Sequence, residues 1–341
     1  MIRRGSVPSS PPRLIMYTLL GCAMAIGEIV GAHAICAQTN PPEVTREQVQ
    51  GWLDEFSNWG RWGPDDELGT LNLITAEKRL NAASMVEDGT VVSLARDVNK
   101  DTAPDNPQPI GHSARFSGSR IGWGSDSYTI NYHGYSYSHI DALPHTGVGG
   151  RLYNDYSTET VGENGAEKLG VQVMQHGLFT RAVLIDIPRL RDVQFLEPGT
   201  AITREELERW ERESGVEIEP GDVLLVRTGR WAKRAQDGPW AAGRQLAGLH
   251  ASTAGWLRGK DIAAIGSDGI TDVLPSGVEG FTHPLHQLLL VGMGTPLFDN
   301  LDLEEVAREA AARGRWSFLF SAAPMRIPGG LGSPINPLVI F

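Results

Sequence analysis

The sequence is poor in cysteine and has no excess of basic residues. Its only two cysteines among 341 residues are Cys22 and Cys36, both near the N-terminus. A folded domain that starts at about Gln38 therefore has no disulfide and no thiolate nucleophile, which excludes cysteine chemistry. The net charge of −11 argues against nucleic acid as the main partner, because phosphate binding requires a basic surface. The chain also lacks the Gly-x-Ser-x-Gly segment of many serine hydrolases and the Lys-Ser/Thr helix start of a phosphate-binding loop.

Long hydrophobic runs are also missing, apart from a short one close to the N-terminus. Leu14–Gly27 is uncharged and mostly apolar, but it is shorter than the roughly 20 residues of a membrane-spanning helix. Arg3 and Arg4 precede this run, and Ala32-His33-Ala34 follows it as a small-x-small site. This order is typical of a secretory signal. We therefore predict a signal peptide at residues 1–37 and a secreted or periplasmic protein without a membrane attachment after cleavage; an uncleaved anchor is the alternative.

Glycine and proline are abundant, with 40 and 21 residues, and indicate many strands joined by tight turns. The remaining chain has no internal repeat and no long linker, so we expect one α/β domain at residues 38–341. Capping signals and apolar periodicity predict helices at 45–52, 76–86, 203–214, 283–291 and 303–313. Short β-branched or alternating runs predict strands at 90–95, 129–137, 182–187, 222–227, 263–266 and 316–322.

Three of the nine histidines lie within thirteen residues, in the segment Tyr132–His145. Since side chains alternate between the two faces of a strand, His133, His139 and Asp141 would share one face. Imidazole and carboxylate groups that converge in this way suit a divalent cation such as Zn or Mn. Pro144 would end the strand and turn His145 back towards the cation, where its imidazole would be the general base that deprotonates the attacking water. The alternative is a polar strand face whose histidines bind only neighbouring groups.

The segment SHIDALPH (Ser138–His145) resembles the signature of the metal-dependent cyclase and kynurenine formamidase-like hydrolase family. Three further segments resemble the family in the same order: SNWGRWGPDDELGTLNLIT (Ser57–Thr75), AIGSDGI (Ala264–Ile270) and HPLHQLLLVGMGTPLFDNLDLEEV (His283–Val306). The resemblance implies a swivelling β/β/α fold, a divalent metal cofactor, hydrolysis of a C–N amide bond in a small molecule, and a homo-oligomer.

The resemblance also assigns roles to individual residues. His139 and Asp141 match metal ligands, His145 matches the catalytic histidine, and His286 matches a histidine on a helix. Asp299 stands where the family usually has Glu, one methylene longer. The well-known members have another histidine four residues before the central one, where this chain has Tyr135. A phenol is a poorer ligand than imidazole near neutral pH. His133, six residues before the central histidine, is the candidate that would replace it.

Four other residues are weaker candidates. Trp59 and Trp62 could form an aromatic wall for a planar substrate, or pack a glycine-rich turn. His283, three residues before His286, is the substitute ligand if the alignment with the family is shifted in this segment. A surface position is favoured for His283. Asp268 is expected to hold a backbone turn.

The sequence leaves two other functions open. One is a lyase or dehydratase that uses the same metal and base. The other is a secreted metal-binding or ligand-binding protein without catalysis, which the absence of a histidine at Tyr135 favours.

Overall fold

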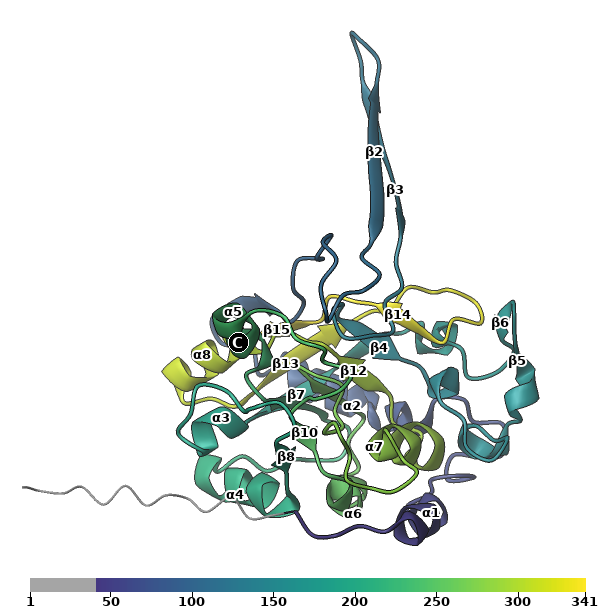
Figure 1. Cartoon of the computed structure of the whole chain (residues 1–341), viewed down its shortest axis with the longest axis vertical. Helices are drawn as coiled ribbons and strands as arrows, with labels where there is room; N and C mark the ends of the chain where they lie inside the picture. The colour runs from purple at the N-terminus through teal and green to yellow at the C-terminus, as the bar shows by residue number, and fades with distance from the viewer. Residues whose placement is uncertain (1–40) are drawn as a thin grey trace, which may run out of the picture. The chain divides into compact units, whose positions relative to one another are not determined.

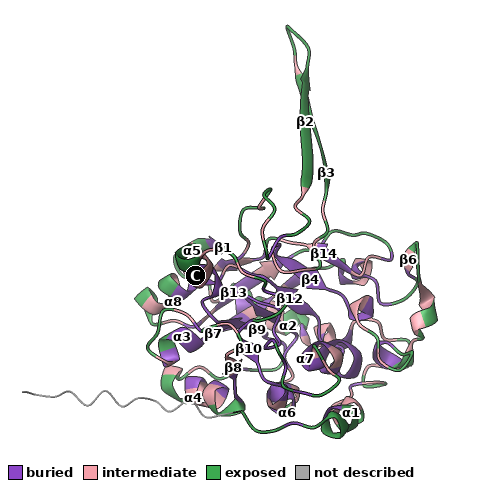
Figure 2. Cartoon of the chain, viewed as in Figure 1, coloured by how far each residue is buried: buried purple, intermediate pink, exposed green. Residues whose placement is uncertain are grey.

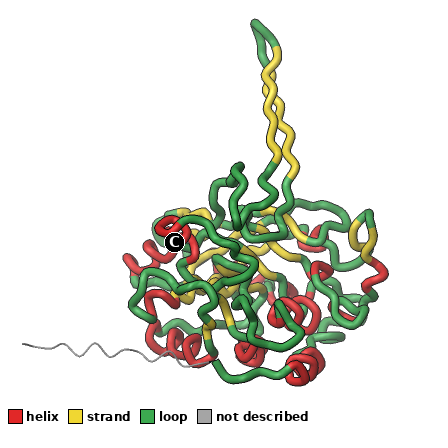
Figure 3. The backbone as a smooth tube through the Cα atoms, viewed as in Figure 1, coloured by secondary structure: helices red, strands yellow, loops and turns green. Residues whose placement is uncertain are grey.

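The structure is a computed structural model that describes residues 41–341, so the predicted signal peptide lies outside the described residues. Within this range, a nine-stranded mixed sheet has the order β1-β15-β13-β7-β9-β11-β12-β4-β14. Helices lie around this sheet, and long loops connect the elements (Figures 1 and 3). The predicted single α/β domain is confirmed. No helix among the described residues has the length and apolar character that crossing a membrane requires.

The strands of the main sheet differ in length and direction. Their bounds are β1 Val91–Ser93, β4 His139–Asp141, β7 Leu178–Asp186, β9 Val223–Arg227, β11 Ala264–Ser267, β12 Leu297–Asp299, β13 Ser317–Ala322, β14 Gly332–Pro334 and β15 Leu338–Ile340. The neighbours β7, β9, β11 and β12 run parallel to one another, whereas all other neighbours in this sheet are antiparallel. Strands β9 and β11 are buried along their whole length, as expected for parallel strands covered on both faces.

Three small two-stranded sheets complete the strands. They pair β2 Gly111–Ser117 with β3 Trp123–Thr129, β5 Val161–Gly162 with β6 Gly165–Ala166, and β8 Ala201–Ile202 with β10 Gly248–Leu249. The hairpin β2–β3 rises away from the body of the domain, and both strands are exposed along their whole length (Figures 1 and 2).

The helices follow the local signals of the sequence. Their bounds are α1 Arg46–Glu55, α2 Ala76–Ala83, α3 Ile187–Leu190, α4 Arg204–Ser214, α5 Arg230–Asp237, α6 Ala254–Lys260, α7 Pro284–His286 and α8 Glu304–Arg313. In α4, Thr203 and Glu206 form the expected capping box, and Gly215 ends the helix with a φ of 70°. The same helix buries Leu207 and Trp210 towards the core. After α7 the chain continues as the π-helix η7 (Gln287–Met293), which is buried at six of its residues.

One predicted strand is wrong. Strand β3 ends at Thr129, residues 130–138 have no regular structure, and β4 begins only at His139. In this segment, side chains of other parts of the chain bind the backbone carbonyl groups, and no neighbouring strand pairs with them. Asn300 donates its Nδ2–H to the carbonyl oxygens of Gly134 (2.7 Å) and Tyr137 (3.2 Å), and Arg230 donates to the carbonyl oxygen of Tyr135.

Candidate metal centre

Strand β4 places two of the predicted ligands at the centre of the site. Its residues His139 and Asp141 are both buried, and in an antiparallel register they lie beside β12, with Asp299 opposite His139. Antiparallel pairing brings directly opposed residues to the same face, so the short strand brings Asp299 to the face of His139 and Asp141.

The backbone fixes the imidazole of His139. Its Nδ1–H donates to the carbonyl oxygen of Tyr137 at 2.8 Å, which leaves Nε2 directed at the carboxylates. Nε2 lies 3.4 Å from Asp141 Oδ1 and 3.9 Å from Asp299 Oδ2. Burial lowers the pKa of His139, but the charge and hydrogen bond of Asp141 and the charge of Asp299 more than offset this and raise it to about 9.

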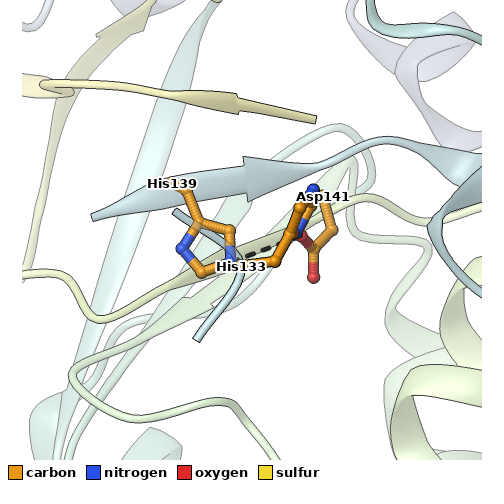
Figure 4. Close-up of side chains that lie close together, drawn as sticks. All are labelled: His133, His139 and Asp141. Atoms are coloured by element: carbon orange, nitrogen blue, oxygen red, sulfur yellow. Dashed lines mark ion pairs between the residues drawn. The ribbon is translucent and has the colours of Figure 1, made fainter. Parts of the chain in front are cut away.

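His133 reaches the same carboxylate from the irregular loop rather than from a strand. Its Nδ1 lies 2.9 Å from Asp141 Oδ1, and its ring meets that of His139 edge-on at a centroid distance of 5.2 Å (Figure 4). The prediction that both histidines and Asp141 converge is therefore confirmed, while the shared strand face that led to it is wrong. Tyr135 also lines the cavity.

His286 reaches the same two carboxylates from α7. Its Nδ1 is 2.7 Å from Asp272 Oδ2, and the same carboxylate accepts the backbone N–H groups of Leu285 and His286. Nε2 of His286 lies 3.7 Å from Asp141 Oδ2 and 3.6 Å from Asp299 Oδ2. Burial opposes the charged form, yet Asp272 and Asp299 raise the pKa of His286 well above its ordinary value.

Asp272 is a functional residue that the sequence analysis missed. It fixes the ring orientation of His286 and caps α7, which is the role that carboxylates often have behind metal-binding histidines. No spacing in the sequence links Asp272 to a histidine fourteen positions away. Its only signal is its place in the loop after AIGSDGI.

His145 lies at the edge of the same cluster. Leu143–His145 is a short 3-10 turn with Pro144 at its second position, and it directs His145 Nε2 to within 3.7 Å of Asp141 Oδ2. The His145 ring stacks on that of His133 at 4.2 Å. Burial lowers the pKa of His145 to about 4. The charges of His133 and His286 also lower this pKa, whereas the charge of Asp141 raises it. The imidazole of His145 is therefore neutral at physiological pH and can accept a proton.

The two carboxylates have the properties expected of metal ligands. Among the described residues, both oxygens of Asp141 and Oδ1 of Asp299 are buried and accept no hydrogen bond of normal geometry, although His133 Nδ1 lies 2.9 Å and His139 Nε2 3.4 Å from Asp141 Oδ1. Two overlapping sets, His133/His139/Asp141 and Asp141/His286/Asp299, each bring three ligand atoms within 4.8 Å of one another. Buried carboxylates are costly unless a cation or a protonated imidazole compensates them, and two buried carboxylates among several imidazoles fit one or two divalent ions.

A cavity of about 300 Å³ opens over these side chains. Its lining includes all five predicted ligands, His145, Tyr135 and His283. The expected surface position of His283 is therefore wrong: the side chain is half-buried, its ring lies 5.5 Å from that of His286, and burial lowers its pKa.

The two tryptophans do not line this cavity. Trp59 packs against the hydrophobic core and donates its indole N–H to the carbonyl oxygen of Val291 at 2.7 Å, whereas Trp62 stacks under the guanidinium of Arg61 at 4.6 Å. Their predicted contact with substrate stays a prediction.

Asp268 holds a backbone turn, as predicted. Its carboxylate accepts the backbone N–H groups of Thr228, Gly229 and Arg230 at the start of α5. Burial raises the pKa of Asp268 to about 6, although the hydrogen bonds from Thr228 act in the opposite direction. Asp268 thus supports Arg230, which in turn holds the loop that carries His133.

Comparison with known proteins gives a consistent result. Residues 72–271 match the family model described as putative cyclase. The crystal structure of a novel cyclase is similar to the chain with a TM-score of 0.75 and 29% identity, over 84% of this chain and 100% of that one. Isatin hydrolase A from Ralstonia solanacearum has a TM-score of 0.54 and 21% identity, over 78% of this chain and 97% of its own.

An isatin hydrolase bound to the product analogue thioisatinate is also similar, with a TM-score of 0.51 and 23% identity, over 78% and 98% of the two chains. At these identities, the isatin hydrolases show that the fold is shared. No curated protein matches the sequence significantly.

Proposed function

The chain belongs to the putative cyclase family, and we propose that it is a metal-dependent hydrolase of a C–N amide bond in a small molecule. The observation that carries this proposal is the pair of buried carboxylates, Asp141 and Asp299, whose oxygens lie 2.9–3.9 Å from ring nitrogens of three imidazoles. His145, whose pKa is lowered to about 4, lines the same cavity, and the size of this cavity suits a small ligand.

His139, Asp141 and His133 would hold a divalent ion. Their mixture of imidazole and carboxylate ligands favours Zn or Mn. His286 and Asp299 would complete this set or hold a second ion that shares Asp141. When bound, the ion polarises an amide carbonyl and makes water acidic enough to be deprotonated near neutral pH.

The chain itself supplies the proton transfer. His145 Nε2 faces the cluster, and its low pKa keeps it neutral, so it takes one proton from the attacking water as the new C–O bond forms. The same nitrogen returns this proton to the leaving nitrogen as the C–N bond breaks. One water is consumed, and a carboxylic acid and an amine are formed.

A cyclic or formylated aromatic amide is the substrate class that we favour. Two of the solved structures with this fold are hydrolases of isatin, a cyclic amide. The apolar side of the cavity, from Ile270 and the ring of Tyr135, suits a planar ring next to the metal-binding side chains.

A substrate panel of an N-formyl arylamine, a cyclic amide, a cyclic imide and a lactone, read by mass spectrometry, tests this proposal. We expect a cyclic amide to give one ring-opened product heavier than the substrate by one water, and the N-formyl arylamine to give the free arylamine and formate. A product of unchanged mass or one lighter by water would assign a lyase or dehydratase, and the lack of any turnover by the metal-loaded protein would favour a binding protein.

We also propose that the protein is exported, since residues 1–37 have the order of a secretory signal. N-terminal sequencing of protein recovered from the periplasm or medium would find a start between Ile35 and Gln38. An intact Met1 on the recovered protein would contradict export with cleavage.

A further inference from the structure

The cavity over the metal centre has two polar side chains that the proposed chemistry does not use. His283 and Gln287 both line this cavity, and neither is a proposed ligand or the proposed base. His283 is absent from both sets of ligand atoms that lie close together among the described residues. These two side chains are therefore available to contact a substrate that is bound at the centre.

The short helix α7 holds the two side chains next to each other. His283 is the residue before α7, and Gln287 is the residue after it. The backbone N–H of Gln287 donates to the carbonyl oxygen of His283 at 3.4 Å, and side chains four positions apart on such a turn are neighbours. The turn is anchored, because Asp272 accepts the backbone N–H of His286 at 3.1 Å. The backbone therefore presents the pair at a fixed position beside the proposed ligands.

Neither side chain has a hydrogen-bond partner within residues 41–341. Both are half-buried, but no group in this range bonds to the ring nitrogens of His283 or to the side-chain amide of Gln287. Polar groups that are partly withdrawn from water without a partner are costly, and a ligand that bonds to them removes this cost. Gln287 also begins the π-helix η7, and π-helical turns are frequent at functional sites. The pair therefore offers hydrogen bonds to a ligand in the cavity.

An uncharged group is the ligand that suits this pair. Burial lowers the pKa of His283, so its ring is neutral at physiological pH and, like the amide of Gln287, both donates and accepts. Among the described residues, the lining of the cavity contains no lysine or arginine that would pair with a carboxylate of the substrate. A charge without a partner is expensive to withdraw from water, so a carbonyl or carboxamide group is favoured over a carboxylate.

We propose that His283 and Gln287 form a subsite for a second, uncharged carbonyl or carboxamide group of the substrate, next to the scissile amide. The ring centroids of His283 and His286 are 5.5 Å apart, a separation that groups on adjacent ring carbons of an aromatic amide can bridge. Ile270 and Tyr135 line the same cavity and would pack against that ring. The inference rests on the proposed amide hydrolysis and adds which amides the site prefers.

Three N-formyl arylamines of similar size test this preference on the metal-loaded protein. They carry a carboxamide, a carboxylate or an isopropyl group ortho to the formamide, so their shapes match while their charge and hydrogen bonding differ. Each kcat/KM is divided by the rate constant for hydrolysis of the same compound by hydroxide, which corrects for the reactivity of the formamide itself. For the wild type, we expect this ratio to be largest for the carboxamide.

Two variants remove the hydrogen bonds of the subsite one at a time. Gln287→Met removes the amide at nearly constant length, and His283→Leu removes the ring nitrogens. Each should lower kcat/KM for the carboxamide by about 3-fold to 10-fold, the effect of one uncharged hydrogen bond, and change the isopropyl substrate by less than about 2-fold. His283→Gln should keep most of the preference, because its amide donates and accepts. The matched control, Gln236→Met with His176→Leu, changes exposed residues outside the cavity and should leave all three substrates unchanged.

Binding of the corresponding anilines separates this inference from the proposed reaction. Anilines with an ortho carboxamide or an ortho isopropyl group lack the formamide, so their dissociation constants can be measured on the metal-loaded protein by ligand-observed NMR, whether or not it hydrolyses amides. We expect the carboxamide to bind more tightly to the wild type, and Gln287→Met and His283→Leu to remove the difference. The same preference in a protein without turnover would refute the proposed hydrolysis and keep the subsite.

Four results would overturn the subsite. The first is a wild type that binds and hydrolyses the carboxamide and isopropyl compounds equally well. The second is an equal loss for both substrates in the variants, which would show that the side chains support the fold or the reaction in general. The third is loss of bound metal from His283→Leu, which would make His283 a ligand. The fourth is a preference for the carboxylate that the variants abolish, which would assign the pair to an anion.

Discussion

Asn300 should control metal affinity without touching the metal. It follows Asp299 directly, is fully buried, and adopts a φ of 56°. Its amide donates to Gly134 and Tyr137, and its Oδ1 accepts from Arg230 Nη1 at 2.5 Å. These contacts hold the loop between His133 and His139, and the carbonyl of Tyr137 in turn orients the His139 ring. Asn300 is therefore a positioning residue for both histidines.

Asn300→Gly removes the amide while keeping the backbone conformation that glycine adopts without strain. Each buried polar group that loses its partner costs about 1–3 kcal/mol, and some of these groups keep another partner. We therefore expect the free energy of unfolding to fall by about 2–4 kcal/mol. Loss of an orienting contact behind the ligands should weaken metal binding by about 10-fold to 100-fold.

Asn154 offers a matched control. It has a φ of 57°, and its amide also clamps a loop, donating to the carbonyl oxygens of Gly63, Pro64 and Asp66. Asn154→Gly should cost similar stability but leave metal affinity unchanged, since its amide does not hold the segment that carries His133 and His139. Calorimetric titration with Zn and Mn, alongside denaturant unfolding of the metal-free proteins, measures both quantities. Equal metal affinities for Asn300→Gly and wild type would refute the reasoning.

Further predictions concern the site itself. His145→Ala should lower kcat for amide hydrolysis by about 10²-fold to 10⁴-fold while metal content stays constant, and loss of the metal instead would make His145 a ligand. His133→Ala should weaken metal binding whereas Tyr135→Phe should not; the reverse result would assign the phenol as ligand. Metal affinity should rise with pH up to about 9, because the pKa of about 9 for His139 and the raised pKa of His286 mean that binding displaces protons from both rings. By the same linkage, both raised pKa values stabilise the metal-free fold fully below about pH 6.5. The contribution of His139 is lost as pH rises through about 9, and that of His286 is lost as pH rises through its own raised pKa. Denaturant unfolding at pH 6 and pH 9 should therefore show a less stable protein at the higher pH.

Local chemistry made five helical regions recognisable in the sequence, whereas α3, α5 and α6 were not predicted. The capping boxes at Thr45 and Thr203 predicted the starts of α1 and α4, because these contacts are made within four residues of the chain. The buried strands β9 and β11 were likewise recognisable from their continuous apolar runs.

The site depends on contacts that the sequence does not display. The alternation in 129–137 predicted a strand, but Arg230 and Asn300 bind the carbonyl groups of this segment and hold it as a loop. His286 and Asp299 could be named only through family resemblance, because the register of β12 beside β4 brings Asp299 to His139 across 160 residues of chain. Asp272 acts only through the tertiary position of His286, and its only signal in the sequence is its place in the loop after AIGSDGI.

The most direct test of the central claim is amide hydrolysis by one protein preparation before and after exhaustive metal removal. We predict that turnover of the best amide substrate is lost with the metal and returns in proportion to added Zn or Mn, reaching full rate at one or two ions per chain. Full turnover by protein shown to be metal-free would contradict the account.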